Sequence, residues 1–146
     1  MYIYEISMLS FRGGMGQDKN LLSNLRQNAR DAVRDGRHTE AFIHLSHAIK
    51  LDEDNVEVLS ERARVSTDNL QYSFAIEDAE QILKLRPESW LGHVRLAEVY
   101  VATVNLDMAI ASYQAAFQCR DADKVHCKAM MDKCKRDLVL DQRVDM

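Results

Sequence analysis

The sequence predicts an all-α fold, a right-handed α-solenoid of three helix-turn-helix units that is followed by a capping helix. Two observations favour helical units: alanine recurs in two columns with a period of 34 residues, and the apolar residues around those alanines follow helical spacing. A third observation excludes an all-β fold. With one proline and five glycines in 146 residues, the chain lacks the turn residues that many hairpins require.

The alanine columns define three units of two helices each. The first column is Ala29, Ala63 and Ala97, and the second is Ala41, Ala75 and Ala109. Two helices cross at normal packing distance only where the side chains are small, so each pair of alanines marks the crossing within one unit. We therefore place the units at about 20–53, 54–87 and 88–121.

Turn and capping residues set the helix boundaries. Gly36 breaks the first helix pair, and Asn69 and Asn105 mark the equivalent breaks in the other two. Between units, turn and N-cap chemistry comes from Asp52, Asp54 and Asn55 at the first boundary and from Pro87, Glu88 and Ser89 at the second. The six predicted helices cover residues 20–34, 39–51, 55–68, 73–86, 89–103 and 107–119.

Both ends of the chain lie outside the repeat. Residues 122–140 predict a capping helix, because an apolar stripe there suits the exposed face of the last unit. That stripe contains Val125, Met130, Met131, Cys134 and Leu138. Residues 1–19 are expected to form an N-terminal tail with a flexible hinge at 12–16, and 141–146 a C-terminal tail. The N-terminal tail is either a disordered extension or an extended segment against the groove or the first helix.

The repeat resembles the tetratricopeptide repeat (TPR), whose period is 34 residues. The third unit matches the signature of that family best, through His93, Leu96, Ala97, Tyr100, Ala109 and Tyr113. The resemblance extends over residues 20–120. It implies a TPR domain over 20–140 in which the first helix of every unit lines a concave, peptide-binding groove.

The resemblance places a basic patch beside an apolar patch in this groove. The basic patch consists of Arg26, Arg30, Arg64 and Arg95, and the apolar patch of Leu91, Val94 and Val101. Guanidinium groups bind carboxylates through two parallel hydrogen bonds, so the patch predicts an acidic or C-terminal segment as the ligand. The alternative is that these arginines only keep an exposed face soluble.

The chain is also similar in outline to TPR domains of cochaperones, which hold the C-terminal Glu-Glu-Val-Asp of heat-shock chaperones in a two-carboxylate clamp. By register, the clamp positions fall on Arg26, Arg30, Glu61, Leu91 and Arg95. Glu61 would repel a carboxylate and Leu91 cannot pair with one. The resemblance therefore implies an incomplete clamp.

Composition and motifs exclude several functions. A net charge of −4 provides no broad positive field for nucleic acid, and no apolar run reaches the length of a membrane span. Three cysteines, an odd number crowded near one end, favour reduced thiols and a cytoplasmic location. His38, His44 and His47 lack metal-ligand spacing, and no nucleophile with a base is evident. We expect no catalytic residue, metal or cofactor.

Taken together, these patterns predict a non-enzymatic scaffold or adaptor that binds a peptide segment of a partner protein in the groove. A chaperone is one candidate partner. Two alternatives stay open: an adaptor of the Hsp70/Hsp90 cochaperone type, and a subunit of an assembly that self-associates through its convex helices and N-terminal tail.

Overall fold

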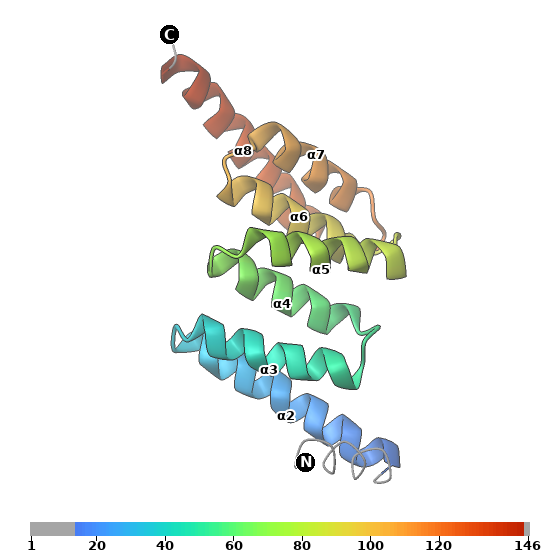
Figure 1. Ribbon diagram of the computed structural model, residues 1–146. Helices are drawn as coiled ribbons and strands as arrows, with labels where there is room; N and C mark the ends of the chain where they lie inside the picture. The colour runs from blue at the N-terminus through green and yellow to red at the C-terminus, as the bar shows by residue number, and fades with distance from the viewer. Residues whose placement is uncertain (1–13, 145–146) are drawn as a thin grey trace. The chain divides into compact units, whose positions relative to one another are not determined.

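The computed structural model describes residues 14–144 of the chain, and these residues form helices joined by short turns, without a strand (Figure 1). The described residues divide into two compact units, one ending at Asp54 and the other beginning at Asn55. Most of the predicted N-terminal tail, residues 1–13, lies outside the described residues.

The first unit is a helical hairpin of α2 (Gly14–Arg34) and α3 (His38–Leu51). Gly36 allows the turn between them, since its φ of +79° is a conformation that residues with a side chain rarely adopt. α2 begins six residues before the predicted start, so the expected tail and hinge end earlier than we placed them. Each glycine inside a helix costs only about 1 kcal/mol of helix stability relative to alanine, and the other residues of a long helix can offset this cost.

The second unit contains two further hairpins and a last helix. Its elements are α4 (Val56–Asp68), α5 (Tyr72–Leu85), α6 (Trp90–Ala102), α7 (Leu106–Phe117) and α8 (Lys124–Val144). α4 packs on α5, α6 packs on α4, α5 and α7, and α8 packs on α7. The predicted bounds of α4 to α7 are correct to within two residues, whereas α8 continues four residues beyond the predicted end.

The N-caps of α4 and α6 are among the turn and capping residues that the sequence indicates at these boundaries. The Asn55 side chain accepts a hydrogen bond from the backbone N–H of Val58 at 3.1 Å, and the Ser89 hydroxyl accepts one from the N–H of Leu91 at 3.4 Å. Each cap satisfies a backbone donor that has no partner within its helix. The sequence therefore fixes where α4 and α6 begin.

α6, α7 and α8 enclose the main core cluster of the second unit. Its buried residues are Val94, Ala97, Leu106, Ala109, Tyr113, Ala116, Cys127, Met131 and Cys134. On α8 the buried positions recur at 127, 131 and 134, with Leu138 partly buried, which is the spacing of one helix face. Val125 lies outside this stripe and is 81% exposed, so its predicted place on the apolar face of the capping helix is wrong.

Two contacts hold the helices of the second unit at close range. Gly92 on α6 lies so near α5 that a Cβ atom there would stand 2.7 Å from Cγ of Leu83. Between α4 and α5, the guanidinium group of Arg62 donates two hydrogen bonds to the carboxylate of Asp78, at 2.8 and 2.7 Å. Both contacts fix how neighbouring helices cross, and the positions of the surface side chains depend on that crossing.

Candidate functional site

Residues from all five helices of the second unit border a pocket of about 310 Å³, which we call the inner pocket. Its lining residues are Arg64, Thr67, Asp68, Leu70, Tyr72, Glu98, Val101, Ala102, Tyr113, His126 and Met130. Two residues of the predicted groove, Arg64 and Val101, lie in it. The pocket therefore combines one exposed guanidinium group with aliphatic and aromatic walls.

Arg95, the second predicted cation of this unit, is engaged by protein groups. Its Nε donates hydrogen bonds to the backbone oxygen and the hydroxyl of Ser60, at 3.1 and 2.8 Å. Its Nη1 donates to Glu98 at 2.7 Å, and only 14% of the Arg95 side chain is exposed. Arg95 thus ties α6 to α4, and its nitrogens are less available to a ligand carboxylate than the sequence suggested.

Glu98 is held by the same network at the border of the inner pocket. Its carboxylate accepts the hydrogen bond from Arg95, so its charge is partly neutralised at the pocket wall. Asp68 adds a second carboxylate near Arg64. The pocket is consequently of mixed charge, whereas the sequence predicted a basic one.

Tyr113 contributes a hydroxyl group that the sequence did not single out as functional. The residue is 1% exposed yet borders the inner pocket, and its ring meets that of His126 edge to face at 6.4 Å between centroids. Burial, and next the negative charge of Glu98, raise the pKa of the Tyr113 hydroxyl. The hydroxyl therefore stays protonated at neutral pH and is a potential hydrogen-bond donor to a ligand.

The three apolar residues of the predicted groove lie in three different places. Val94 is 2% exposed and belongs to the core cluster of α6, α7 and α8, so it does not line a groove. Val101 borders the inner pocket, and Leu91 lies in a different pocket. Helical spacing alone does not separate these positions, because partners pack on α6 from more than one side.

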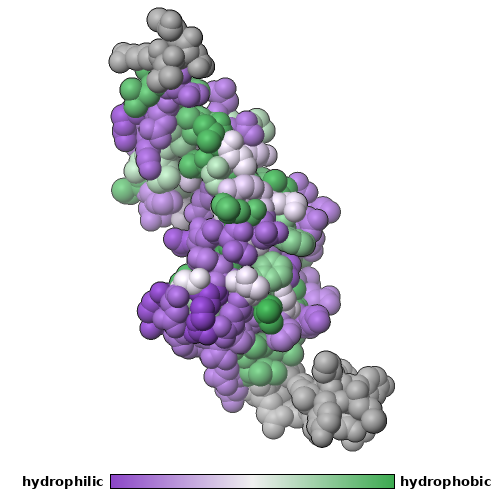
Figure 2. Space-filling model, turned by 60° about the vertical axis from the view of Figure 1, so that its left-hand side comes forward, coloured by the Kyte–Doolittle hydropathy of each residue, from purple (hydrophilic) through white to green (hydrophobic). Residues whose placement is uncertain are grey.

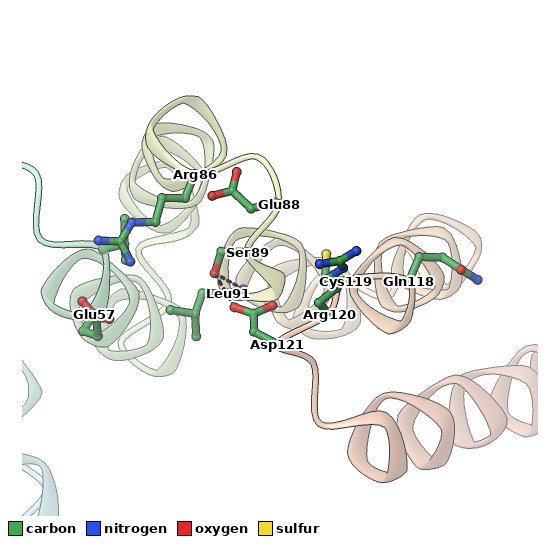
Figure 3. A pocket seen from close by; sticks show the side chains of 10 residues that line it. Glu57, Arg86, Glu88, Ser89, Leu91, Gln118, Cys119, Arg120 and Asp121 are labelled. Carbon is green, nitrogen blue, oxygen red and sulfur yellow. Dashed lines mark hydrogen bonds between the residues drawn. The ribbon is translucent and has the colours of Figure 1, made fainter.

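The second pocket, of about 480 Å³, lies where the loops between hairpins meet, and we call it the loop pocket (Figure 3). It is lined by Val56, Glu57, Arg86, Glu88, Ser89, Leu91, Gln118, Cys119, Arg120 and Asp121. Figure 3 shows Leu91 between Glu57 and Asp121. Asp121 accepts hydrogen bonds from the Ser89 hydroxyl at 3.0 Å and the Trp90 N–H at 2.9 Å, so this carboxylate caps α6.

The remaining predicted groove residues belong to the first unit. Arg30 is exposed on α2 and Arg26 is half-buried there, and both interact with other groups of the protein. The alignment of these arginines with Arg64 stays a prediction. Glu61, at one clamp position, is half-buried on α4 and also has an interaction partner.

In the part of the chain whose side chains the structure describes, no group of three or more histidine, cysteine, aspartate or glutamate side chains is placed to hold a metal ion. None of the described helices combines the length and apolar character that crossing a bilayer requires. Cys119, Cys127 and Cys134 are unpaired, and burial raises the pKa of each thiol.

No protein-family model matches the chain. Among curated proteins, it is 26% identical over 102 residues to U-box domain-containing protein 70 of Oryza sativa subsp. japonica. That match covers 70% of this chain, which spans only 13% of the length of the rice protein.

Solved structures of TPR domains share the fold. The OM64 TPR domain of Arabidopsis has a TM-score of 0.70 at 15% identity, covering 82% of this chain and 98% of its own. The Sgt2 TPR domain of Aspergillus fumigatus has a TM-score of 0.70 at 20% identity, covering 84% and 82%. The first TPR of Spaghetti (RPAP3), bound to the HSP90 peptide SRMEEVD, has a TM-score of 0.69 at 15% identity, covering 82% and 94%. The predicted all-α, TPR-type fold is confirmed.

Proposed function

We propose that the chain is a non-enzymatic adaptor that binds a segment of a partner protein in the inner pocket of its second unit. The observation that carries the proposal is the pocket itself, which brings Arg64, Val101 and Tyr113 together from three helices. Such a pocket, in which aliphatic and aromatic walls stand beside charged groups, suits one side chain of a bound peptide. A cytoplasmic location belongs to the same proposal and is supported by the unpaired cysteines.

The ligand that fits is a bulky apolar side chain next to a carboxylate. Val101, Met130 and the ring of Tyr72 provide apolar contact, and Arg64 can pair with the carboxylate. Because Arg64 is exposed, this ion pair adds little affinity and is screened by salt. Affinity should therefore depend mainly on the apolar side chain.

The experiment is a screen of a random peptide library, followed by calorimetry on the peptides that bind. Val101→Glu should abolish binding, while Leu91→Glu, an equivalent change in the loop pocket, should leave it intact. Arg64→Glu should weaken binding about tenfold, and Lys84→Glu, on an exposed face of α5, should have little effect. Circular dichroism checks the fold of each variant. Peptides that bind Val101→Glu as tightly as the wild type would refute the proposal.

A heat-shock chaperone tail is the less favoured ligand, although one structural neighbour was solved with such a peptide. Glu61 and Leu91 depart from the clamp pattern, and Arg95 already pairs with Glu98. Each missing charge-assisted hydrogen bond costs about 1.5–3 kcal/mol, so two defects weaken a micromolar site at least a hundredfold. We expect no measurable heat of binding with SRMEEVD. Micromolar affinity would instead place this chain among adaptors of the chaperone-binding kind.

A further inference from the structure

Four large apolar side chains are exposed on one side of the second unit, away from the core. Leu70 and Val104, in the turns between paired helices, are 70% and 67% exposed, and Phe74 and Met108, one helical turn later, are 47% and 50% exposed. The two turns lie on the same side of the unit, at the left in Figure 1. Figure 2 brings this side forward and shows apolar surface among hydrophilic side chains.

Folding does not explain the two turn residues. Leu70 and Val104 have φ values of +62° and +59°, a region that side chains disfavour. The equivalent residue of the first hairpin is Gly36, and the position equivalent to Phe74 and Met108 is Glu40. The backbone therefore accepts glycine at this turn, yet the second unit carries strained, exposed, apolar residues there. Strain of this kind indicates a functional role.

The surroundings of Phe74, Val104 and Met108 are acidic, whereas Leu70 also borders the pocket that Arg64 lines. Residues 67–83 and 96–119 contain no lysine or arginine, while Glu77 and Asp107 lie exposed beside the apolar residues. We call the apolar residues Leu70, Phe74, Val104 and Met108 with these two carboxylates the acidic edge. It calls for a partner surface that is both apolar and cationic.

A groove near the C-terminal end of α8 has the complementary chemistry, since Asp137 and Asp141 are exposed on that helix but do not line the groove. Lys135, Arg136, Val139 and Leu140 are all exposed there and line one shallow groove, and we call them the basic tip. Val139 and Leu140 are 48% and 56% exposed, beyond the stretch of α8 that packs on the core cluster. α8 ends on the same side of the unit as the two turns (Figure 1).

We propose that two copies of this chain form a symmetric dimer in which the basic tip of each copy packs on the acidic edge of the other. Because both surfaces lie on one side of the unit, a twofold axis satisfies both contacts at once and closes the assembly. Apolar side chains form the centre of each contact and opposite charges its rim, as in protein interfaces generally. Phe74, Val104 and Met108 lie outside the inner pocket and only Leu70 borders both surfaces, so the inference does not depend on the proposed function.

Two charge-reversed variants of the full chain test the pairing. One is Glu77→Lys with Asp107→Lys on the acidic edge, and the other is Lys135→Glu with Arg136→Glu on the basic tip. By sedimentation equilibrium, the wild type should dimerise at micromolar concentration, and each variant should dimerise at least about tenfold more weakly. An equimolar mixture of the two should recover wild-type dimerisation, since both contacts of the mixed dimer then join opposite charges.

A third variant separates docking from folding. Leu70→Asn with Val104→Asn removes the apolar side chains but introduces a residue that tolerates positive φ. It should weaken dimerisation at least about tenfold without lowering the melting temperature of the monomer, measured below the concentration at which dimers form. A wild type that is monomeric at all concentrations, a dimer that none of the variants weakens, an assembly larger than a dimer, or a mixture that fails to recover would each overturn the proposal.

Discussion

The Arg62–Asp78 ion pair should be among the most costly single contacts to break in the second unit. It joins α4 to α5 through two hydrogen bonds, and the side chains are only 22% and 5% exposed. Asp78→Ala leaves the Arg62 guanidinium group half-buried without that carboxylate. Breaking a buried pair in this way costs about 3–5 kcal/mol, and the partial exposure of Arg62 favours the lower end of that range.

We expect Asp78→Ala to lower the free energy of unfolding by about 3 kcal/mol, equivalent to a decrease of roughly 6–12 °C in melting temperature. Urea unfolding followed by tryptophan fluorescence measures this, because the single tryptophan, Trp90, lies in the second unit. Asp31→Ala is the control, and because it lies in the first unit its unfolding is followed by circular dichroism instead of Trp90 fluorescence. Its pair with Arg34 has side chains 46% and 71% exposed, so the loss there should not exceed about 0.5 kcal/mol.

A double substitution distinguishes the effect of the charges from the effect of side-chain packing. Replacing both partners, Arg62→Met with Asp78→Leu, removes the charges together and should be nearly neutral or slightly stabilising. A loss below about 1 kcal/mol for Asp78→Ala would refute the reasoning, because the carboxylate would then contribute no more than an ordinary exposed ion pair. A double variant as unstable as Asp78→Ala would also contradict it.

Two further predictions concern packing and thiol chemistry. Gly92→Ala should destabilise the second unit by about 1–2 kcal/mol in urea unfolding, because the strain of overpacking exceeds the gain in helix propensity. In the control Gly36→Ala nothing lies within 4 Å of the added Cβ atom, so only the backbone strain of the turn should change. In the folded protein, a chromogenic disulfide reagent at pH 8 should modify Cys119 before the buried Cys127 and Cys134. Burial raises the pKa of these thiols, so the stability that they contribute is complete below about pH 8.5, where unfolded thiols ionise, and decreases as the pH rises above it. Equal labelling rates, or stability that is constant up to pH 10, would contradict this.

The helices could be predicted from sequence because their determinants are local and repeated. The column alanines are buried with at most 2% of their surface exposed, and Asn55 and Ser89 cap the helices that they precede. Helical spacing and capping act over a few residues, so the sequence displays them directly. The start of α2 at Gly14 was not predictable, because the glycines there resemble a hinge and the helix that offsets their cost lies further along the chain.

The candidate site was predicted less completely, because it depends on pairs of interacting side chains that do not recur with the repeat. Arg95 has the charge of a ligand-binding residue, but Ser60 and Glu98 take up its donors. The partners of such a pair are set by the rotation of each helix about its axis. The contact between Arg62 and Asp78 has no counterpart in the other units, where the equivalent residues are asparagine with histidine and leucine with serine.

Two kinds of residue recur with the period of 34 residues, and they have different roles. Positions such as Ala63 and Ala97 are buried and small, so they set the distance between helices. Leu70 and Val104 recur at the same interval but are exposed and strained, so packing cannot be the reason for their apolar character. Because Leu70 and Val104 contribute little to the core, substituting them should alter association without altering the fold. Changing an alanine of the first pair should disrupt the fold and, through it, both surfaces.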